Sequence, residues 1–289
     1  MILKRSEQLK KFWEEQLEMK REDSLPNWIL EKISYHEKRG SKVARITGKG
    51  TLYRAFEDEN QEVKVEYNLG VTFFVKQGDH FYHEEDERMH QAIFYKNTLV
   101  EDKEIQAPTK MEVVPPIEPI EREDAGNMRF EYDRRAAVQY AERWWNDYNP
   151  EYRKFDVDCT NYVSQCLHAG GAPMWGAPNR GQGWWYQNEN WSYSWAVAHA
   201  LRWYLSGANQ GLKGKEVENP SELMPGDVIC YDFEGDGKWD HNTIVVEKDN
   251  DGMPLVNAHT DNSRHRYWSY EDSYAWTEDC KYKFFRIGE

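Results

Sequence analysis

The sequence predicts an α+β protein with two domains, and three features of the chain support this prediction. Residues 3–34 have the spacing of apolar positions that is typical of helices, whereas residues 43–94 change to a period of two, which is typical of strands. A proline-rich stretch with little periodicity follows at residues 106–127, and helical spacing then resumes. We therefore expect an N-terminal α+β domain at residues 1–105, a linker at 106–127 and a second domain at 128–289.

The N-terminal part reads as two short helices followed by an antiparallel sheet. Leu9, Trp13 and Leu17 share one helical face, and Pro26 interrupts the pattern before a second helix. A half-buried strand is then indicated by alternating apolar residues, namely Val63, Val65, Tyr67, Leu69, Val71, Phe73 and Val75. The break at residues 76–79 predicts a hairpin turn. This order of elements resembles the cystatin-like and NTF2-like folds, and the segment shows no catalytic set of residues.

Composition indicates a globular protein and excludes several classes of partner. The chain has 289 residues with 39% hydrophobic and 15% aromatic content, which supports a packed core. Acidic residues outnumber basic ones by 51 to 37, and the net charge is −14. Because nucleic acids and anionic membrane surfaces bind through a basic face, we expect neither as a partner.

The chain shows no targeting, membrane-spanning or metal-binding pattern. The N-terminus has no signal peptide, and no run is long enough for a transmembrane segment. The sequence therefore does not decide between a cytoplasmic location and export by a leader or route that is not visible in this chain. Four cysteines without a CxxC pair argue against a disulfide framework or a zinc site, and we expect no cofactor.

The segment from Asp158 to Tyr162 is the candidate nucleophile site. Apolar residues recur at helical spacing from Cys159 to Leu167, and Gly170-Gly171 marks the end of the helix. Cys159 would then lie at a helix N-terminus, where the helix dipole lowers a thiol pKa and free backbone N–H groups can hold an oxyanion. We expect the N–H groups of Asp158 and Cys159 to form this oxyanion site. The alternative is an ordinary buried thiol, which is the better description of Cys166.

A thiolate needs a base, and later strands supply candidates. His241 directly precedes the β-branched run 243–246, so it would begin a strand. On the next expected strand, Asn257 and His259 share a face at period two. Either side chain could fix the tautomer of His241, and we favour His259. The alternative for all three is ordinary polarity at strand ends.

Together these segments resemble a known family. The run FDVDCTNYVSQCLHAGGAP, then Pro225-Gly226-Asp227, DHNTIVV and NAHT are similar to the amidase domain of Firmicutes, which is related to the NlpC/P60 and CHAP cysteine peptidases. The resemblance covers about residues 130–289. It implies a papain-like fold with a cysteine-bearing helix packed on an antiparallel sheet. It also implies Cys159 as nucleophile, His241 as base, His259 or Asn257 as third member, and amide bonds of cell-wall (peptidoglycan) peptides as substrates.

Two further features bear on function. Trp184, Trp185 and Tyr186 follow a glycine-containing loop, and we expect them to line a substrate groove. The acidic run at residues 232–237 resembles half of a calcium loop, but it lacks the closing glutamate and is interpreted as a solvated hairpin. The leading hypothesis is a cysteine amidase or peptidase. The alternatives are an acyltransferase or transpeptidase with the same residues, and a non-catalytic wall- or peptide-binding module.

Overall fold

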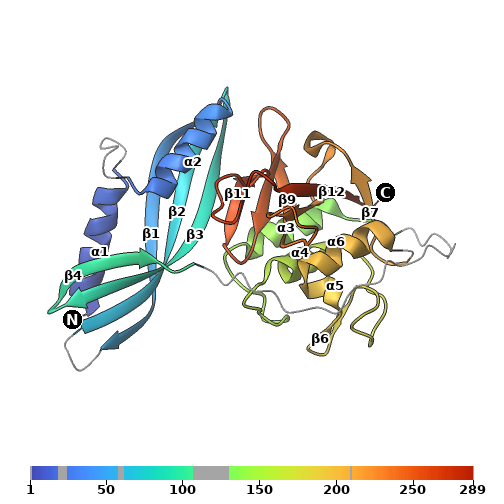
Figure 1. Ribbon diagram of the computed structural model, residues 1–289, viewed down its shortest axis with the longest axis horizontal. Helices are drawn as coiled ribbons and strands as arrows, with labels where there is room; N and C mark the ends of the chain where they lie inside the picture. The colour runs from blue at the N-terminus through green and yellow to red at the C-terminus, as the bar shows by residue number, and fades with distance from the viewer. Residues whose placement is uncertain (1, 19–24, 58–61, 107–129, 209, 289) are drawn as a thin grey trace. The chain divides into compact units, whose positions relative to one another are not determined.

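The computed structural model describes residues 2–18, 25–57, 62–106, 130–208 and 210–288. The chain divides into two compact units, Met1–Ala107 and Pro108–Glu289. Both units combine helices with antiparallel strands, as Figure 1 shows, so the expected α+β class is observed. The expected linker at residues 106–127 lies, except for its first residue, outside the described residues.

The N-terminal unit consists of two helices that pack on a four-stranded antiparallel sheet. Its helices are α1 (Ile2–Gln16) and α2 (Asn27–Lys38), which starts directly after Pro26. Its strands, in the order in which they pair, are β1 (Lys42–Glu57), β2 (Glu62–Gln77), β3 (His80–Tyr95) and β4 (Thr98–Glu104). The order of helices and strands is the one that the sequence pattern predicts.

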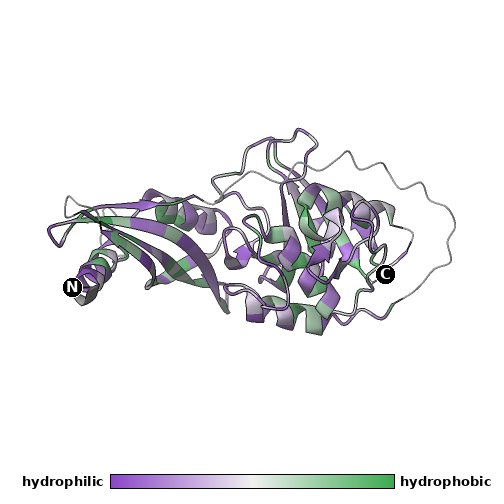
Figure 2. Cartoon of the chain, turned by 90° about the horizontal axis from the view of Figure 1, so that it is seen from below, coloured by the Kyte–Doolittle hydropathy of each residue, from purple (hydrophilic) through white to green (hydrophobic). Residues whose placement is uncertain are grey.

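Strand β2 has the alternation that the sequence predicts. All seven apolar residues from Val63 to Val75 are buried, and the residues between them are more exposed in most cases. Figure 2 shows the matching bands of hydrophobic and hydrophilic residues along these strands. The predicted hairpin is also present, because Gln77 pairs with His80 across a two-residue turn in which Gly78 has a φ of 59°.

Within the described residues of the C-terminal unit, four α-helices and a six-stranded antiparallel sheet surround the candidate site. The helices are α3 (Arg134–Trp144), α4 (Cys159–Ala169), α5 (Tyr193–Ala196) and α6 (Ala198–Gly207). In pairing order the strands are β11 (Ser263–Tyr267), β10 (Pro254–Ala258), β9 (His241–Lys248), β8 (Val228–Asp232), β12 (Lys281–Ile287) and β7 (Gly214–Val217). Strands β5 (Tyr186–Gln187) and β6 (Asn190–Trp191) form a separate ribbon, and a 3₁₀ helix covers Pro220–Glu222. No helix in the described parts of the chain is long and apolar enough to cross a membrane.

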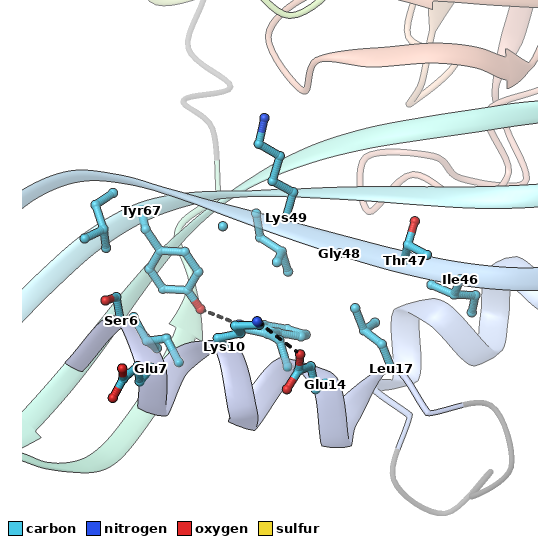
Figure 3. A pocket seen from close by; sticks show the side chains of 15 residues that line it. Ser6, Glu7, Lys10, Glu14, Leu17, Ile46, Thr47, Gly48, Lys49 and Tyr67 are labelled. Atoms are coloured by element: carbon cyan, nitrogen blue, oxygen red, sulfur yellow. Dashed lines mark hydrogen bonds and ion pairs between the residues drawn. The ribbon is translucent and has the colours of Figure 1, made fainter. Parts of the chain in front are cut away.

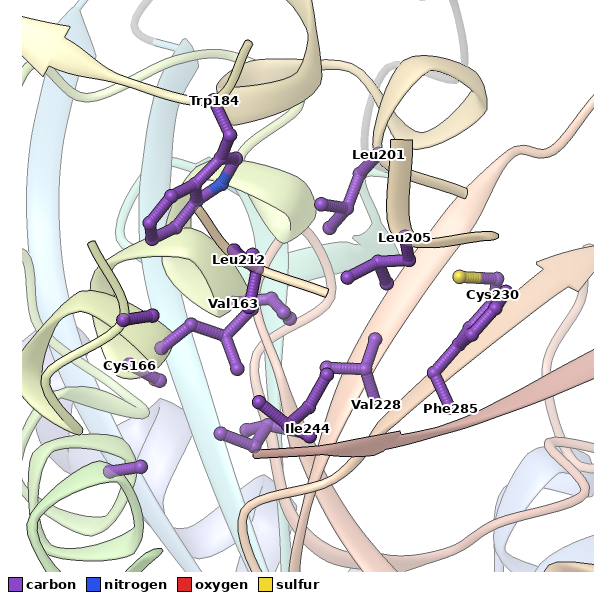
Figure 4. Packing of buried hydrophobic residues seen from close by; sticks show 14 of the residues in the cluster. Val163, Cys166, Trp184, Leu201, Leu205, Leu212, Val228, Cys230, Ile244 and Phe285 are labelled. Carbon is purple, nitrogen blue, oxygen red and sulfur yellow. The ribbon is translucent and has the colours of Figure 1, made fainter. Parts of the chain in front are cut away.

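The two faces of this sheet have separate cores. Val228, Cys230 and Ile244 point toward the helices and pack with Val163 and Cys166 of α4 (Figure 4). The alternate residues of β8 and β9 turn to the opposite face, where a second cluster includes Ile229, Tyr231, Val245, Tyr270 and Phe284. Since side chains alternate along a strand, the residue number within β9 decides which face a side chain occupies.

A buried carboxylate ties the ends of this unit together. Asp133 caps α3 by accepting the N–H of Ala136 at 2.9 Å. The next residue, Arg134, pairs with Asp227 at 2.6 Å, and Asp227 also accepts the backbone N–H groups of Met224 and Ile287. The Pro225-Gly226-Asp227 segment therefore joins α3 to the start of β8 and the end of β12.

Candidate active site

Cys159 is the first residue of α4, as predicted, and its side chain is buried with 1% exposure. The carboxylate of Asp158 shapes the turn before it. One oxygen, Oδ1, accepts the N–H of Phe155 at 3.0 Å and the side-chain N–H of Asn161 at 2.9 Å. The backbone N–H of Asp158 donates to Oγ1 of Thr260 at 3.1 Å. The loop that carries the nucleophile candidate is thus held from within α4 and from the far end of β10.

The thiol of Cys159 lies against two backbone N–H groups and a hydroxyl. The N–H groups of Thr160 and Asn242 point to Sγ, and Oγ1 of Thr160 lies 3.7 Å from it. The side-chain amide of Asn242 donates to the same hydroxyl at 2.9 Å. Burial raises the pKa of Cys159 above its usual range, and these hydrogen bonds oppose that rise without cancelling it. The thiol is therefore protonated at neutral pH, whereas the helix terminus alone had predicted a lowered pKa.

His241 begins β9, as predicted, but its ring occupies the sheet face opposite α4. Asn242 points its side chain to Thr160 on α4, and alternation sends His241 the other way. The ring centroids of Tyr231, Phe233 and Tyr270 lie 5.6, 6.0 and 5.1 Å from that of His241. Nε2 of His241 is buried without a hydrogen-bond partner.

The environment of His241 keeps its imidazole neutral. Burial, with a smaller contribution from the positive charge of Arg266, lowers the pKa of His241 to about 3. The main chain nevertheless places this residue beside the thiol, because the N–H of Asn242 points to Sγ of Cys159. The main chain of His241 therefore lies next to Sγ, because the amide nitrogen of Asn242 is bonded to the carbonyl carbon of His241. The structure brings the two residues together through the backbone and does not join their side chains.

The ring of His259 contacts the nucleophile loop and not His241. Nδ1 lies 2.8 Å from Oδ2 of Asp158, and Nε2 lies 2.7 Å from the carbonyl oxygen of Trp144. The ring stacks on Tyr162 with 4.0 Å between centroids. A carbonyl only accepts hydrogen bonds, so Nε2 donates to Trp144, while Nδ1 faces the carboxylate of Asp158. Both ring nitrogens of His259 therefore face oxygen atoms and not the thiol of Cys159.

The side chain of Asn257 also forms its hydrogen bonds with residues other than His241. Its side-chain N–H donates to Oε1 of Glu142 at 3.0 Å, and its Oδ1 accepts the N–H of His265 at 2.9 Å. Glu142 also pairs with Arg264 and with the ring of His265, and these contacts lower the pKa of Glu142 to about 2 although burial opposes them. Asn257 therefore links α3 to β10 and β11.

Two of the three expected groove residues belong to the core. Trp184 and Trp185 are 0% and 2% exposed. Nε1 of Trp184 donates to Oγ of Ser164 at 2.9 Å, and Nε1 of Trp185 donates to loop carbonyl groups. The expectation of a groove wall is corrected for these tryptophans, because a fully buried ring offers no surface to a ligand. Tyr186 is partly exposed and keeps a surface on which a substrate can pack.

Three residues that the sequence analysis did not single out contact the site. Thr160 and Asn242 each follow a predicted catalytic residue, so their position next to Cys159 and His241 was the available signal. Oδ1 of Asn242 is buried without a hydrogen-bond partner, which favours a role toward substrate. Thr260 has a φ of 86°, a strained value for a β-branched residue, and no sequence pattern predicts it.

An acidic group lies in the loop before His241. Oxygen atoms of Asp232, Glu234 and Asp240 come within 4.8 Å of one another, which is a spacing that a hard cation can bridge. Asp232 accepts the N–H groups of Asp236 and Gly237, and Asp240 accepts that of Phe233. Burial, and the nearby Glu234, raise the pKa of Asp240 to about 7. These backbone contacts show that Asp232 and Asp240 close the loop; Asp232 is buried, so the expected solvated hairpin is corrected at that residue, while Glu234 is exposed.

Comparisons with known proteins identify the family. Residues 131–285 match the family model described as "Putative amidase domain". A Bacillus subtilis (strain 168) protein named "Uncharacterized protein YhbB" is 46% identical over 257 residues, which cover 87% of this chain and 83% of that protein. "Uncharacterized protein YjcM" from the same organism is 34% identical over 128 residues, or 41% of this chain and 29% of that protein. No solved structure matches. The chain therefore belongs to the family of this amidase domain.

Proposed function

We propose that the C-terminal unit hydrolyses amide bonds through a thioester on Cys159, in the manner of the NlpC/P60 and CHAP cysteine peptidases with their papain-like fold. The observation that carries this proposal is the position of Cys159. It starts a helix, and its sulfur lies against the N–H groups of Thr160 and Asn242, beside the main chain of His241. Family membership supports action on amides, and the nucleophile and substrate are our inference.

The base in this proposal is His241 and not His259. A general base must accept the thiol proton, and His241 is neutral with an unpartnered Nε2. Both nitrogens of His259 already face acceptors, namely Asp158 and the carbonyl of Trp144. In this proposal the ring of His241 leaves its aromatic pocket and turns toward Sγ of Cys159 when the substrate binds.

The proposed reaction has two stages, acylation of Cys159 and hydrolysis of the thioester. His241 takes the proton of Cys159, and the thiolate attacks the amide carbonyl carbon to form a tetrahedral oxyanion. The C–N bond breaks as the imidazolium returns the proton to the leaving amine. Water, deprotonated by His241, hydrolyses the thioester and releases the carboxylic acid together with the free thiol.

Oxyanion stabilisation comes from N–H groups at the start of α4. Helix geometry leaves the N–H of Cys159 without an acceptor inside the helix, and it can donate to the oxyanion. The N–H of Asp158, which the sequence analysis included, already donates to Thr260. The oxyanion site in this proposal is therefore the N–H of Cys159 without that of Asp158, while the N–H groups of Thr160 and Asn242 face Sγ of Cys159.

His259 acts on the nucleophile loop in this account. It holds the carboxylate of Asp158, the residue before Cys159, and so positions the nucleophile and not the base. The third member of the catalytic set is thus a positioning residue. Asn257 supports the same region through Glu142.

We propose peptides of the peptidoglycan type as substrates, on the resemblance to wall-cleaving relatives. The test is incubation with purified muropeptides followed by mass spectrometry of the products. The expected result is amide cleavage by the wild type and by Cys166→Ala, and no cleavage by Cys159→Ala. Cys166 lies two turns along the same helix and controls for the loss of a buried thiol. Equal cleavage by Cys159→Ala would refute the proposal.

An acyltransferase is the second candidate, since the same thioester can react with an amine in place of water. Adding a competing amine distinguishes the two activities. A transferase forms a new amide at the expense of the acid, whereas a hydrolase continues to release the acid.

A further inference from the structure

The N-terminal unit contains a cavity that the proposed reaction does not use. It has a volume of about 640 Å³ and lies between α1 and the inner side of β1 and β2 (Figure 3). This size falls within the roughly 300–1,000 Å³ that is typical of small-molecule sites. From this cavity we infer that the N-terminal unit binds an uncharged, mainly apolar small molecule.

The cavity exists because β1 lacks two inward side chains. The inward positions of β1 read Ile46, Gly48, Gly50 and Leu52, whereas Thr47 and Lys49 point away (Figure 3). Two successive inward glycines leave a trough about 7 Å long, since side chains on one strand face repeat every second residue. A glycine inside a strand often marks a place where another group approaches closely.

Helix α1 fills only one end of this trough. A Cβ on Gly48 would come within 2.5 Å of Cδ1 of Leu17, so helix packing already occupies that position. A Cβ on Gly50 would meet only Cδ2 of Tyr67, at 3.8 Å, which is ordinary contact. The space above Gly50 can therefore accept atoms.

The walls are apolar and held in place by hydrogen bonds. Nε1 of Trp13 donates to Oη of Tyr67 at 2.6 Å, and Tyr67 donates to Oδ1 of Asp102 at 2.7 Å. The other carboxylate oxygen of Asp102 lies 3.0 Å from Nδ1 of His90. Burial raises the pKa of Tyr67, so its hydroxyl stays neutral. These contacts fix both aromatic walls before a ligand arrives, which lowers the entropic cost of binding.

The lining also selects the class of ligand. The hydroxyl of Tyr67 already accepts one hydrogen bond and donates another. The rest of the deep lining comes from apolar side chains such as Leu9, Leu17 and Leu69. Water finds few partners on such walls, and transfer of apolar groups into the cavity is favourable. At the rim, α1 presents Glu7 together with Lys10 and Glu14, which lie 3.7 Å apart. This rim has no excess positive charge, so it does not favour an anionic ligand.

The test uses the full chain and the uncharged fluorescent probe N-phenyl-1-naphthylamine, with 1-decanol as competitor. The wild type is expected to bind one probe saturably and to release it to decanol. Gly50→Val fills the trough and is expected to weaken binding by about tenfold or more, which corresponds to about 1.4 kcal/mol. Gly70→Val is the matched control, because Gly70 pairs with Lys49, on the outward face, and a Cβ there has ordinary contacts.

Probe binding by the wild type and by the two variants decides whether the inference holds. Loss of binding in Gly50→Val with retention in Gly70→Val supports the inference. Absence of saturable binding by the wild type, unchanged binding by Gly50→Val, or equal loss in both variants overturns it. Circular dichroism of both variants shows whether the fold is kept. The inference is independent of Cys159, so muropeptide cleavage neither supports nor weakens it.

Discussion

The neutral, buried imidazole of His241 makes the C-terminal unit sensitive to acid. In the folded protein the pKa of His241 is lowered to about 3, whereas an unfolded histidine titrates near pH 6.5. As the pH falls below 6.5 the unfolded chain binds a proton that the folded chain does not. The free energy of unfolding therefore decreases with falling pH, by about 1.4 kcal/mol for each unit, down to the folded pKa.

The perturbation is His241→Phe, which removes the titrating group and keeps an aromatic ring among Tyr231, Phe233 and Tyr270. Between pH 7.5 and pH 5.0 the wild type should lose about 2 kcal/mol through His241 alone. This loss should be absent in the variant, while every other titrating group contributes to both proteins. The pH dependence of the variant should accordingly be shallower.

Urea unfolding followed by tryptophan fluorescence measures this difference. All tryptophans except Trp13 and Trp28 lie in residues 108–289, so the signal reports mainly on the C-terminal unit. NMR of labelled histidine provides a direct check, because the His241 ring should not titrate between pH 5 and pH 8. Equal pH slopes in the two proteins, or a His241 titration near pH 6.5, would refute the burial argument.

Burial also governs the behaviour of three other side chains, Cys159, Asp227 and Trp184. Because burial raises the pKa of Cys159, its alkylation by iodoacetamide should have a higher pH midpoint in the folded protein than in urea. An equal or lower midpoint in the folded protein, measured by site-resolved mass spectrometry, would contradict this. Asp227→Ala removes the buried carboxylate that pairs with Arg134 and should lower the free energy of unfolding by about 3–5 kcal/mol. Asp236→Ala in an exposed loop should leave the free energy of unfolding nearly unchanged, and urea unfolding compares the two variants. Trp184→Ala should lower the free energy of unfolding by about 3–5 kcal/mol, because the ring is part of the core. Tyr186→Phe should leave the free energy of unfolding nearly unchanged. Equal stability of the two variants would place Trp184 outside the core.

Local patterns were sufficient to predict much of the fold. Alternation from Val63 to Val75 predicted the buried face of β2, and Pro26 marked the start of α2. The start of α4 at Cys159 followed from helical spacing that ends at Gly170. In each case the signal lies within a few residues and reflects the burial of one face of a single element.

Contacts between distant segments could not be predicted in this way. The alternation of side chains along a strand shows that His241 and Asn242 lie on opposite faces of the sheet. It does not show which of the two side chains faces α4. The pairing of His259 with Asp158 joins residues about a hundred positions apart, and no local pattern encodes it. Trp184 and Trp185 follow a glycine-containing loop that suggests exposure, yet hydrogen bonds from both indole groups make burial favourable.

Two opposing influences act on the pKa of the Cys159 thiol, and the sequence indicated only the first of them. A helix N-terminus lowers a cysteine pKa, while burial raises it. At Cys159 the burial is nearly complete, and the pKa is raised. Activation of the thiol in this account depends on transfer of its proton to His241 when the substrate is bound.

The most direct test of the account is to trap the thioester. Wild-type protein is mixed with muropeptides, quenched in acid during turnover and analysed by peptide mapping with mass spectrometry. We predict a hydroxylamine-sensitive acyl group on Cys159 of the wild type, and no acyl group when His241 is replaced, because acylation needs the same base. An acyl group on another residue, or wild-type rates of amide cleavage by Cys159→Ala, would contradict it.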